Sequence, residues 1–164
     1  MRLIGDNMNK LVKNKITKEE FYKLDEKDLM FITNPGRMGD EDGVTFVIKS
    51  DNNYTVYRID GWMYRNNINE DYISLEDVSK VFPKWRETWK NSNNENYHGK
   101  YTYLYMGFGN GLCVDNSIYN EFKPYLDRKV EELLEREEDK EALEYAAVYN
   151  AWEDAFISMM ENRK

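Results

Sequence analysis

Two pairs of short strand-like segments, each joined by turn-forming residues, constrain most strongly what this chain can fold into. The first pair, residues 44–49 and 54–60, is rich in β-branched and aromatic residues and is joined by the sequence SDNN, which favours a turn and tolerates a left-handed backbone. The second pair, residues 101–106 and 112–114, is joined by GFGNG. Segments so close in sequence pair antiparallel, so both pairs predict β-hairpins.

Helical patterns dominate the C-terminal part of the chain beyond Asp115. One apolar stripe contains Leu126, Val130, Leu133 and Leu134, and a second contains Tyr145, Val148, Tyr149, Trp152, Phe156 and Met159. Both stripes have the spacing of one helix face. We therefore expect two antiparallel helices joined near Glu138 and Asp139.

Shorter elements are marked by capping signatures. Thr17 with Glu20, and Ser74 with Asp77, have the spacing of capping boxes and predict two short helices. Pro83 cannot continue the second of these helices but is well suited to open another, which places Trp85 and Trp89 on one stripe. Residues 29–33 have the composition of a further strand.

These elements predict an α+β fold. We expect an antiparallel sheet built from hairpins, with the two C-terminal helices and the short N-terminal and central helices packed against one face. The 164-residue length fits one domain, assigned here to residues 17–164. Residues 1–16 form a basic arm, which we expect to be poorly ordered because chain termini fray.

Cysteine content and hydropathy indicate a cytoplasmic protein. Cys113 is the only cysteine, so an internal disulfide is impossible and a reducing compartment fits best. Neither a secretory signal pattern nor a run of about 20 apolar residues is found, so we expect no membrane anchoring.

The net charge of −8 bears on the class of partner. An acidic chain repels nucleic-acid phosphates, so we predict no direct binding of nucleic acid. The same charge favours association with a basic protein.

Two glycine-containing loops are candidate contact regions. GFGNG at residues 107–111 precedes a strand rather than a helix, so it predicts a hairpin turn and not a phosphate-binding loop. The loop over residues 34–43 gathers acidic side chains without the spacing of a calcium-binding loop, so we expect neither a metal nor another cofactor. We predict a partner-binding surface formed by this loop and an aromatic cluster, namely Arg37, Asp40, Glu41, Asp42, Trp62 and Tyr64.

A catalytic site has little support in the sequence. Cys113 and His98 could form a nucleophile and a base oriented by Asp115, but Cys113 lies between Leu112 and Val114, where a buried, inert thiol is the usual outcome. We therefore predict no catalytic residues and no enzyme activity.

The aromatic content of 15% offers an alternative site. Tyr101, Tyr103 and Tyr105 alternate along one side of a predicted strand, and Phe108 follows in the turn. Such rings can stack on a nucleotide or a sugar. We expect their main role to be packing, beneath the C-terminal helices.

The leading functional hypothesis is a non-enzymatic protein-interaction module. A small cytoplasmic inhibitor, an immunity factor or a phage anti-defence protein that binds a basic or nucleic-acid-handling target would fit this description. A small-ligand domain for nucleotides or sugars is the alternative, and an enzyme with a dispersed acid/base site is the third. The sequence does not specify the oligomeric state.

Overall fold

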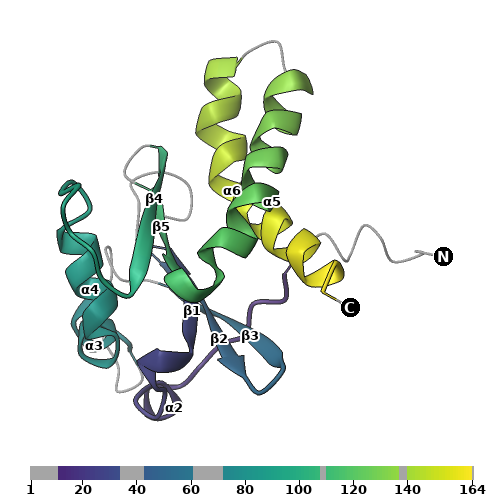
Figure 1. The fold of residues 1–164 in the computed structure, drawn as a ribbon. Coiled ribbons are helices and arrows are strands. Elements are labelled where there is room, and N and C mark those ends of the chain that lie inside the picture. The colour runs from purple at the N-terminus through teal and green to yellow at the C-terminus, as the bar shows by residue number, and fades with distance from the viewer. Residues whose placement is uncertain (1–10, 34–42, 61–71, 108–109, 137–139, 164) are drawn as a thin grey trace. The chain divides into compact units, whose positions relative to one another are not determined.

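The computed structural model describes residues 11–33, 43–60, 72–107, 110–136 and 140–163. These residues form a five-stranded antiparallel sheet and several helices, which confirms the predicted α+β class (Figure 1). The strands are β1 (Leu29–Thr33), β2 (Val44–Ser50), β3 (Asn53–Ile59), β4 (Tyr101–Gly107) and β5 (Asn110–Asp115). The helices are α2 (Lys18–Phe21), the 3-10 turn η1 (Glu26–Asp28), α3 (Leu75–Val81), α4 (Pro83–Lys90), α5 (Asn116–Arg136) and α6 (Lys140–Glu161).

The chain divides into two compact units, which are described separately. One unit spans Lys13–Asn116 and contains the sheet with α2, η1, α3 and α4, and the other contains the helical segment Ser117–Lys164. The assignment of residues 17–164 to one domain stays a prediction.

The sheet has the strand order β3-β2-β1-β5-β4, so β1 lies between the two hairpins. Both predicted hairpins are present, with β2 paired to β3 and β4 paired to β5. Asp51 in the first turn has a φ of 54°, the left-handed geometry that its sequence favours. Strand β1 pairs antiparallel with β2 on one side and with β5 on the other.

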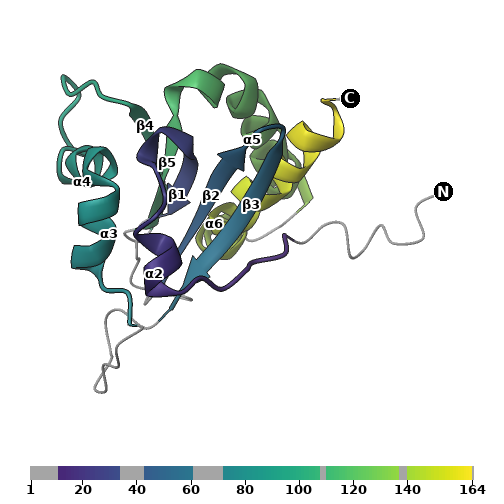
Figure 2. The same ribbon diagram turned by 90° about the horizontal axis from the view of Figure 1, so that it is seen from below.

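One face of the sheet packs against the short helices. Figure 2 shows α2, α3 and α4 on the same side of the strands. Phe21 of α2, Phe46 of β2 and Phe82, which follows α3, make edge-to-face ring contacts with centroids 5.4 to 5.8 Å apart. Trp85 of α4 is fully buried in the same cluster. Helices α2, α3 and α4 and all five strands contribute buried side chains to this core.

The carboxylate of Asp77 joins α2 to α3. It accepts hydrogen bonds from the backbone N–H of Ser74 (2.9 Å), which completes the predicted capping box, and from the hydroxyl of Tyr22 (2.5 Å). Lys18 lies 3.6 Å away. Burial alone would raise the pKa of Asp77, but these hydrogen bonds, with the nearby Lys18 charge, hold that pKa below its usual value.

The helical unit contains the two predicted C-terminal helices, α5 and α6. Their buried side chains follow helical spacing and are Ile118, Phe122, Leu126, Ala151, Trp152, Ala155, Phe156 and Met159. Arg163, just beyond α6, donates two hydrogen bonds of 2.6 and 2.7 Å to Glu121 near the start of α5. This contact requires the helices to be antiparallel. The predicted connection at Glu138 and Asp139 lies outside the described residues.

We predict that Asp77→Ala lowers the free energy of unfolding by about 2 kcal/mol, because it removes a helix cap and leaves Tyr22 without its acceptor. The depressed pKa of Asp77 means that its contribution is present at neutral pH and is lost as the pH falls below the ordinary carboxyl range. Urea denaturation at several pH values measures this. A difference between wild type and variant that did not shrink on acidification would contradict the assignment.

Candidate functional site

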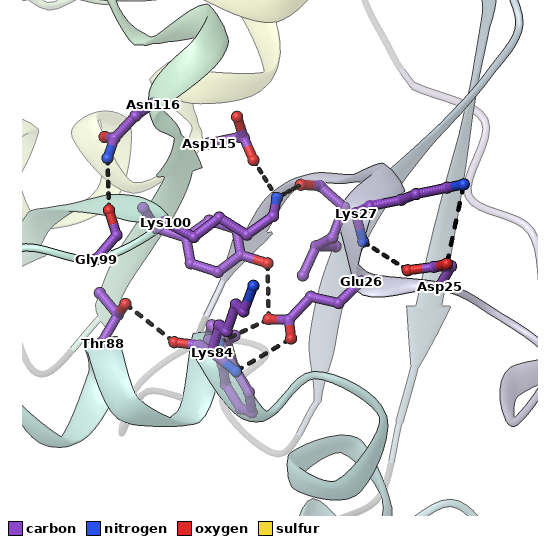
Figure 3. A network of polar contacts seen from close by, with 12 residues as sticks. Asp25, Glu26, Lys27, Lys84, Thr88, Gly99, Lys100, Asp115 and Asn116 are labelled. Atoms are coloured by element: carbon purple, nitrogen blue, oxygen red, sulfur yellow. Dashed lines mark hydrogen bonds and ion pairs between the residues drawn. The ribbon is translucent and has the colours of Figure 1, made fainter.

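The carboxylate of Glu26 in η1 forms hydrogen bonds with the start of α4 and with the first residue of β4 (Figure 3). It accepts hydrogen bonds from the backbone N–H groups of Lys84 (3.1 Å) and Trp85 (2.8 Å) at the start of α4. It also accepts a hydrogen bond from the hydroxyl of Tyr101 on β4 (2.8 Å). Phe82 occupies the N-cap position of α4 and provides no side-chain acceptor, so Glu26 of η1 caps the helix in its place.

A second polar cluster closes the open end of the β4–β5 hairpin (Figure 3). The ammonium group of Lys100 forms an ion pair with Asp115 and donates to the backbone carbonyl of Leu29 (3.2 Å). The side chain of Asn116 donates to the carbonyl of Gly99 (2.8 Å) and accepts from Thr102 (2.6 Å). These contacts fix the first residues of β4 relative to β1 and β5.

The three tyrosines of β4 pass from buried to exposed along the strand. Tyr101 is 4% exposed, Tyr103 is half-buried, and Tyr105 is 68% exposed. Tyr101 and Tyr103 belong to the core cluster that includes Trp85, to which α2, α3 and α4 all contribute. The Tyr103 ring also lies over Gly111 of β5, where a Cβ atom would overlap it. Tyr105 is therefore the only one of the three with a widely accessible ring.

Burial perturbs the ionisation of the inner tyrosines. Burial, followed by the nearby charge of Glu26, raises the pKa of Tyr101 strongly, so this hydroxyl stays protonated and acts as a donor. Burial also raises the pKa of Tyr103 to about 12. Neither group is available as a base at neutral pH.

The register of β4 determines which of its backbone groups point outward. Residues of an antiparallel strand alternately direct their N–H and C=O groups toward one side and the other. The N–H of Asn116 donates to the carbonyl of Lys100 (3.0 Å), so these two residues form a hydrogen-bonded pair. Hydrogen-bonded pairs recur at every second residue, so the backbone groups of Thr102 and Leu104 also face β5. The residues whose backbone groups point away from β5 are Tyr101, Tyr103 and Tyr105.

The two edges of the sheet differ in how they are covered. At β3, the N–H of Asn14 donates to the carbonyl of Val56 (2.8 Å), and the N–H of Arg58 donates to the carbonyl of Asn14 (2.9 Å). The Asn14 side chain donates to Val56 as well (3.0 Å). At β4, no strand within the described ranges pairs with the outer side. The outer edge of β4 is therefore the candidate site.

The sequence-predicted contact residues have different outcomes. Arg37, Asp40, Glu41, Asp42, Trp62, Tyr64 and Phe108 lie outside the described residues. Tyr101 and Tyr103 are brought together in the core, and Tyr105 continues the same row at the exposed end of β4. A stacking surface that uses the Tyr101 ring would require this side chain to leave the core and its bond to Glu26.

The cysteine considered as a nucleophile is buried. Cys113 is 1% exposed and shares a cluster with Tyr101 and Tyr103, whereas His98 is exposed in the loop before β4. Burial raises the pKa of the Cys113 thiol to about 12, so the thiolate that nucleophilic chemistry needs is scarce at neutral pH.

Sequence reasoning missed Glu26 and Lys100. The partners of Glu26 lie 58 to 75 residues away, so no local pattern marks it as a cap. One signal was available, because a helix that begins at Phe82-Pro83 has no capping side chain of its own and requires an acceptor from elsewhere.

Within the portions of the chain that the structure describes, no three His, Cys, Asp or Glu side chains are arranged to hold a metal ion. None of the described helices is long and apolar enough to cross a membrane.

We predict that Glu26→Ala lowers the free energy of unfolding by about 2 kcal/mol, because two amides of α4 and the Tyr101 hydroxyl lose a charged acceptor. Tryptophan fluorescence during urea denaturation measures the effect. Glu19→Ala, which removes an exposed carboxylate on α2, is the matched control and should change stability little. Equal losses in the two variants would contradict the role assigned to Glu26.

We also predict that Cys113 reacts with an aromatic disulfide reagent only when the protein unfolds, because the thiol is buried and protonated. Labelling in buffer and in denaturant, followed by absorbance, measures this. Rapid stoichiometric labelling of the folded protein would show that the thiol is accessible.

Comparisons with protein-family models, with curated proteins and with solved structures found no match.

Proposed function

We propose that this chain is a cytoplasmic, non-enzymatic protein-interaction module that binds an extended segment of a target protein along the outer edge of β4. The incoming segment would add a sixth strand to the sheet. In this mode the backbone supplies most of the hydrogen bonds, and the side chains on either face of the added strand supply selectivity.

The open edge of β4 is the observation that carries this proposal. The outward N–H and C=O groups of Tyr101 and Tyr103 have no partner strand in the described part of the chain, whereas the other edge is covered by Asn14. Natural edge strands usually carry charged residues or proline, which block pairing. Residues 101–107 contain neither, and the irregularity in their pairing falls at the end of the strand, between Tyr105 and Gly107.

The base of β4 is held in place before any partner arrives. Glu26 binds the Tyr101 hydroxyl, and Lys100 pairs with Asp115, so this end of the strand has little freedom to lose on binding. A preorganised strand reduces the entropic cost of association. The exposed ring of Tyr105 lies at the other end, where an aromatic residue can contribute a large contact area.

The charge of the chain supports a basic target. The whole chain has a net charge of −8, and residues 117–164 hold thirteen acidic against seven basic side chains. Complementary charge increases the rate of association and discriminates against acidic competitors. A basic protein, including one that itself handles nucleic acid, is the class of target that this charge favours.

Two substitutions at one position test the use of the β4 backbone. Tyr103→Pro removes an N–H that points away from β5, whereas Tyr103→Ala removes the same ring and keeps the N–H. We expect the proline variant to bind an isolated target at least roughly tenfold more weakly than the alanine variant, which corresponds to about 1.4 kcal/mol. Titration calorimetry with the purified target, after circular dichroism has confirmed folding, measures this difference. Equal affinities would mean that β4 is not the binding strand.

The acidic loop remains a proposed additional contact. Reversing the charge at Asp40, Glu41 and Asp42 tests it, because the sequence predicts that these residues touch the partner together with Arg37, Trp62 and Tyr64. We expect weaker binding that is most evident at low salt. Unchanged affinity would remove the loop from the interface and leave the β4 proposal in place.

A further inference from the structure

We infer that a second copy of this chain is one occupant of the β4 edge, and that two copies pair antiparallel through β4 about a two-fold axis at Tyr103. This inference depends on the open edge that also underlies the proposed function, but it names the partner. The two sheets would join into one continuous sheet, with both β4 strands at its centre.

The sequence of β4 is nearly symmetric about Tyr103. Residues 101–105 read Tyr-Thr-Tyr-Leu-Tyr, so a two-fold axis at Tyr103 places each Tyr101 opposite Tyr105 of the second copy. Tyr103 is an outward-facing residue, so the pair of Tyr103 residues on the axis is a hydrogen-bonded pair in the antiparallel pattern. Aromatic cross-strand pairs stabilise such an arrangement. A closed two-fold interface also meets the symmetry requirement for a discrete dimer.

Strand β4 is buried at one end and exposed at the other, which suits antiparallel pairing with a second copy. Tyr101, at one end, is 4% exposed in the aromatic cluster beside α4, and Tyr105, at the other end, is 68% exposed. Antiparallel pairing brings the exposed end of each strand to the covered end of the other. The accessible Tyr105 ring of one copy would then lie beside the Tyr101 and Trp85 cluster of the second copy.

Charge permits two copies to approach at this strand. Like charges would repel two chains that each carry −8, but no charged residue occurs between Lys100 and Asp115. In the two-fold register, Lys100 of one copy lies opposite Met106 of the other, so no like-charged pair is created between the two paired strands. This uncharged stretch is therefore suited to self-pairing in an otherwise acidic protein.

Self-pairing and target binding would exclude each other because both require the same outward backbone groups. The dimer would protect the uncharged edge until a target segment replaces the second copy. Strength of self-association would then set the concentration of protein that is available to bind the target.

Light scattering coupled to size-exclusion chromatography over a range of concentrations tests the inference on the full chain. We expect wild type to reach twice the monomer mass as concentration rises. Tyr103→Ala loses the aromatic pair on the axis but keeps the N–H, so it should reach that mass at a higher concentration, and Tyr103→Pro should remain monomeric. A wild-type mass that stays monomeric at every concentration, or a dimer that persists in Tyr103→Pro, would overturn the inference. Circular dichroism of each variant separates a lost interface from a lost fold.

Amide hydrogen exchange provides a second, residue-specific readout. In a dimer with this register, exchange at the amide of Tyr103 should slow as the protein concentration rises, while Thr102 and Leu104, which face β5, should change little. Protection that is independent of concentration would contradict the self-pairing.

The two proposals fail in different ways. A monomeric wild type whose target binding is still lost in Tyr103→Pro would remove the second copy and keep the proposed function. A β4-dependent dimer whose target binding is equal in the proline and alanine variants would keep the second copy and remove β4 from target binding.

Discussion

The double pairing of β1 is the constraint on which the sheet depends. All five of its residues are buried, and its backbone bonds to β2 on one side and to β5 on the other. Each hairpin therefore has its inner strand occupied, and only β3 and β4 are left at the edges. The chain covers β3 itself through Asn14, since the segment before α2 runs beside that strand. The position of β1 thus determines which strands lie at the edges, and only one of these two edges, β3, is covered by another described segment of the chain.

Glu26 connects the sheet to one of the helices that cover it. One carboxylate satisfies two amides at the start of α4 and the Tyr101 hydroxyl, so the helix, η1 and β4 are bonded to a single group. Buried or partly buried carboxylates of this kind are useful only when their acceptor capacity is filled, as it is here. The stacked rings of Trp85 and Trp89, with centroids 5.3 Å apart, then lie over the buried end of β4. Strand β4 is therefore hydrogen-bonded and buried at Tyr101 and presents an exposed aromatic ring at Tyr105.

The sequence predicted the elements whose determinants are local. Both hairpins, both capping boxes and the helix opened by Pro83 follow from residues within a few positions of one another. The order of the strands could not be obtained in this way, because inserting β1 between the hairpins is decided by packing between segments far apart in sequence. For the same reason the sequence did not predict that Trp85 of α4 shares a cluster with Tyr101 and Tyr103. The tertiary cap by Glu26 had no local signature. The acidic loop and the Trp62 cluster lie outside the described residues, so their part in a contact surface stays a prediction.

Because β4 is uncharged while the whole chain is acidic, the two proposed associations should respond differently to ionic strength. Association of two like-charged copies through a neutral strand should strengthen as added salt screens their mutual repulsion, whereas association with a basic target should weaken as the same salt screens attraction. The electrolyte around the protein would thus shift the same strand between two occupants without any change in its structure. If both proposals hold, the choice of partner at β4 would be sensitive to the ionic conditions of the cell.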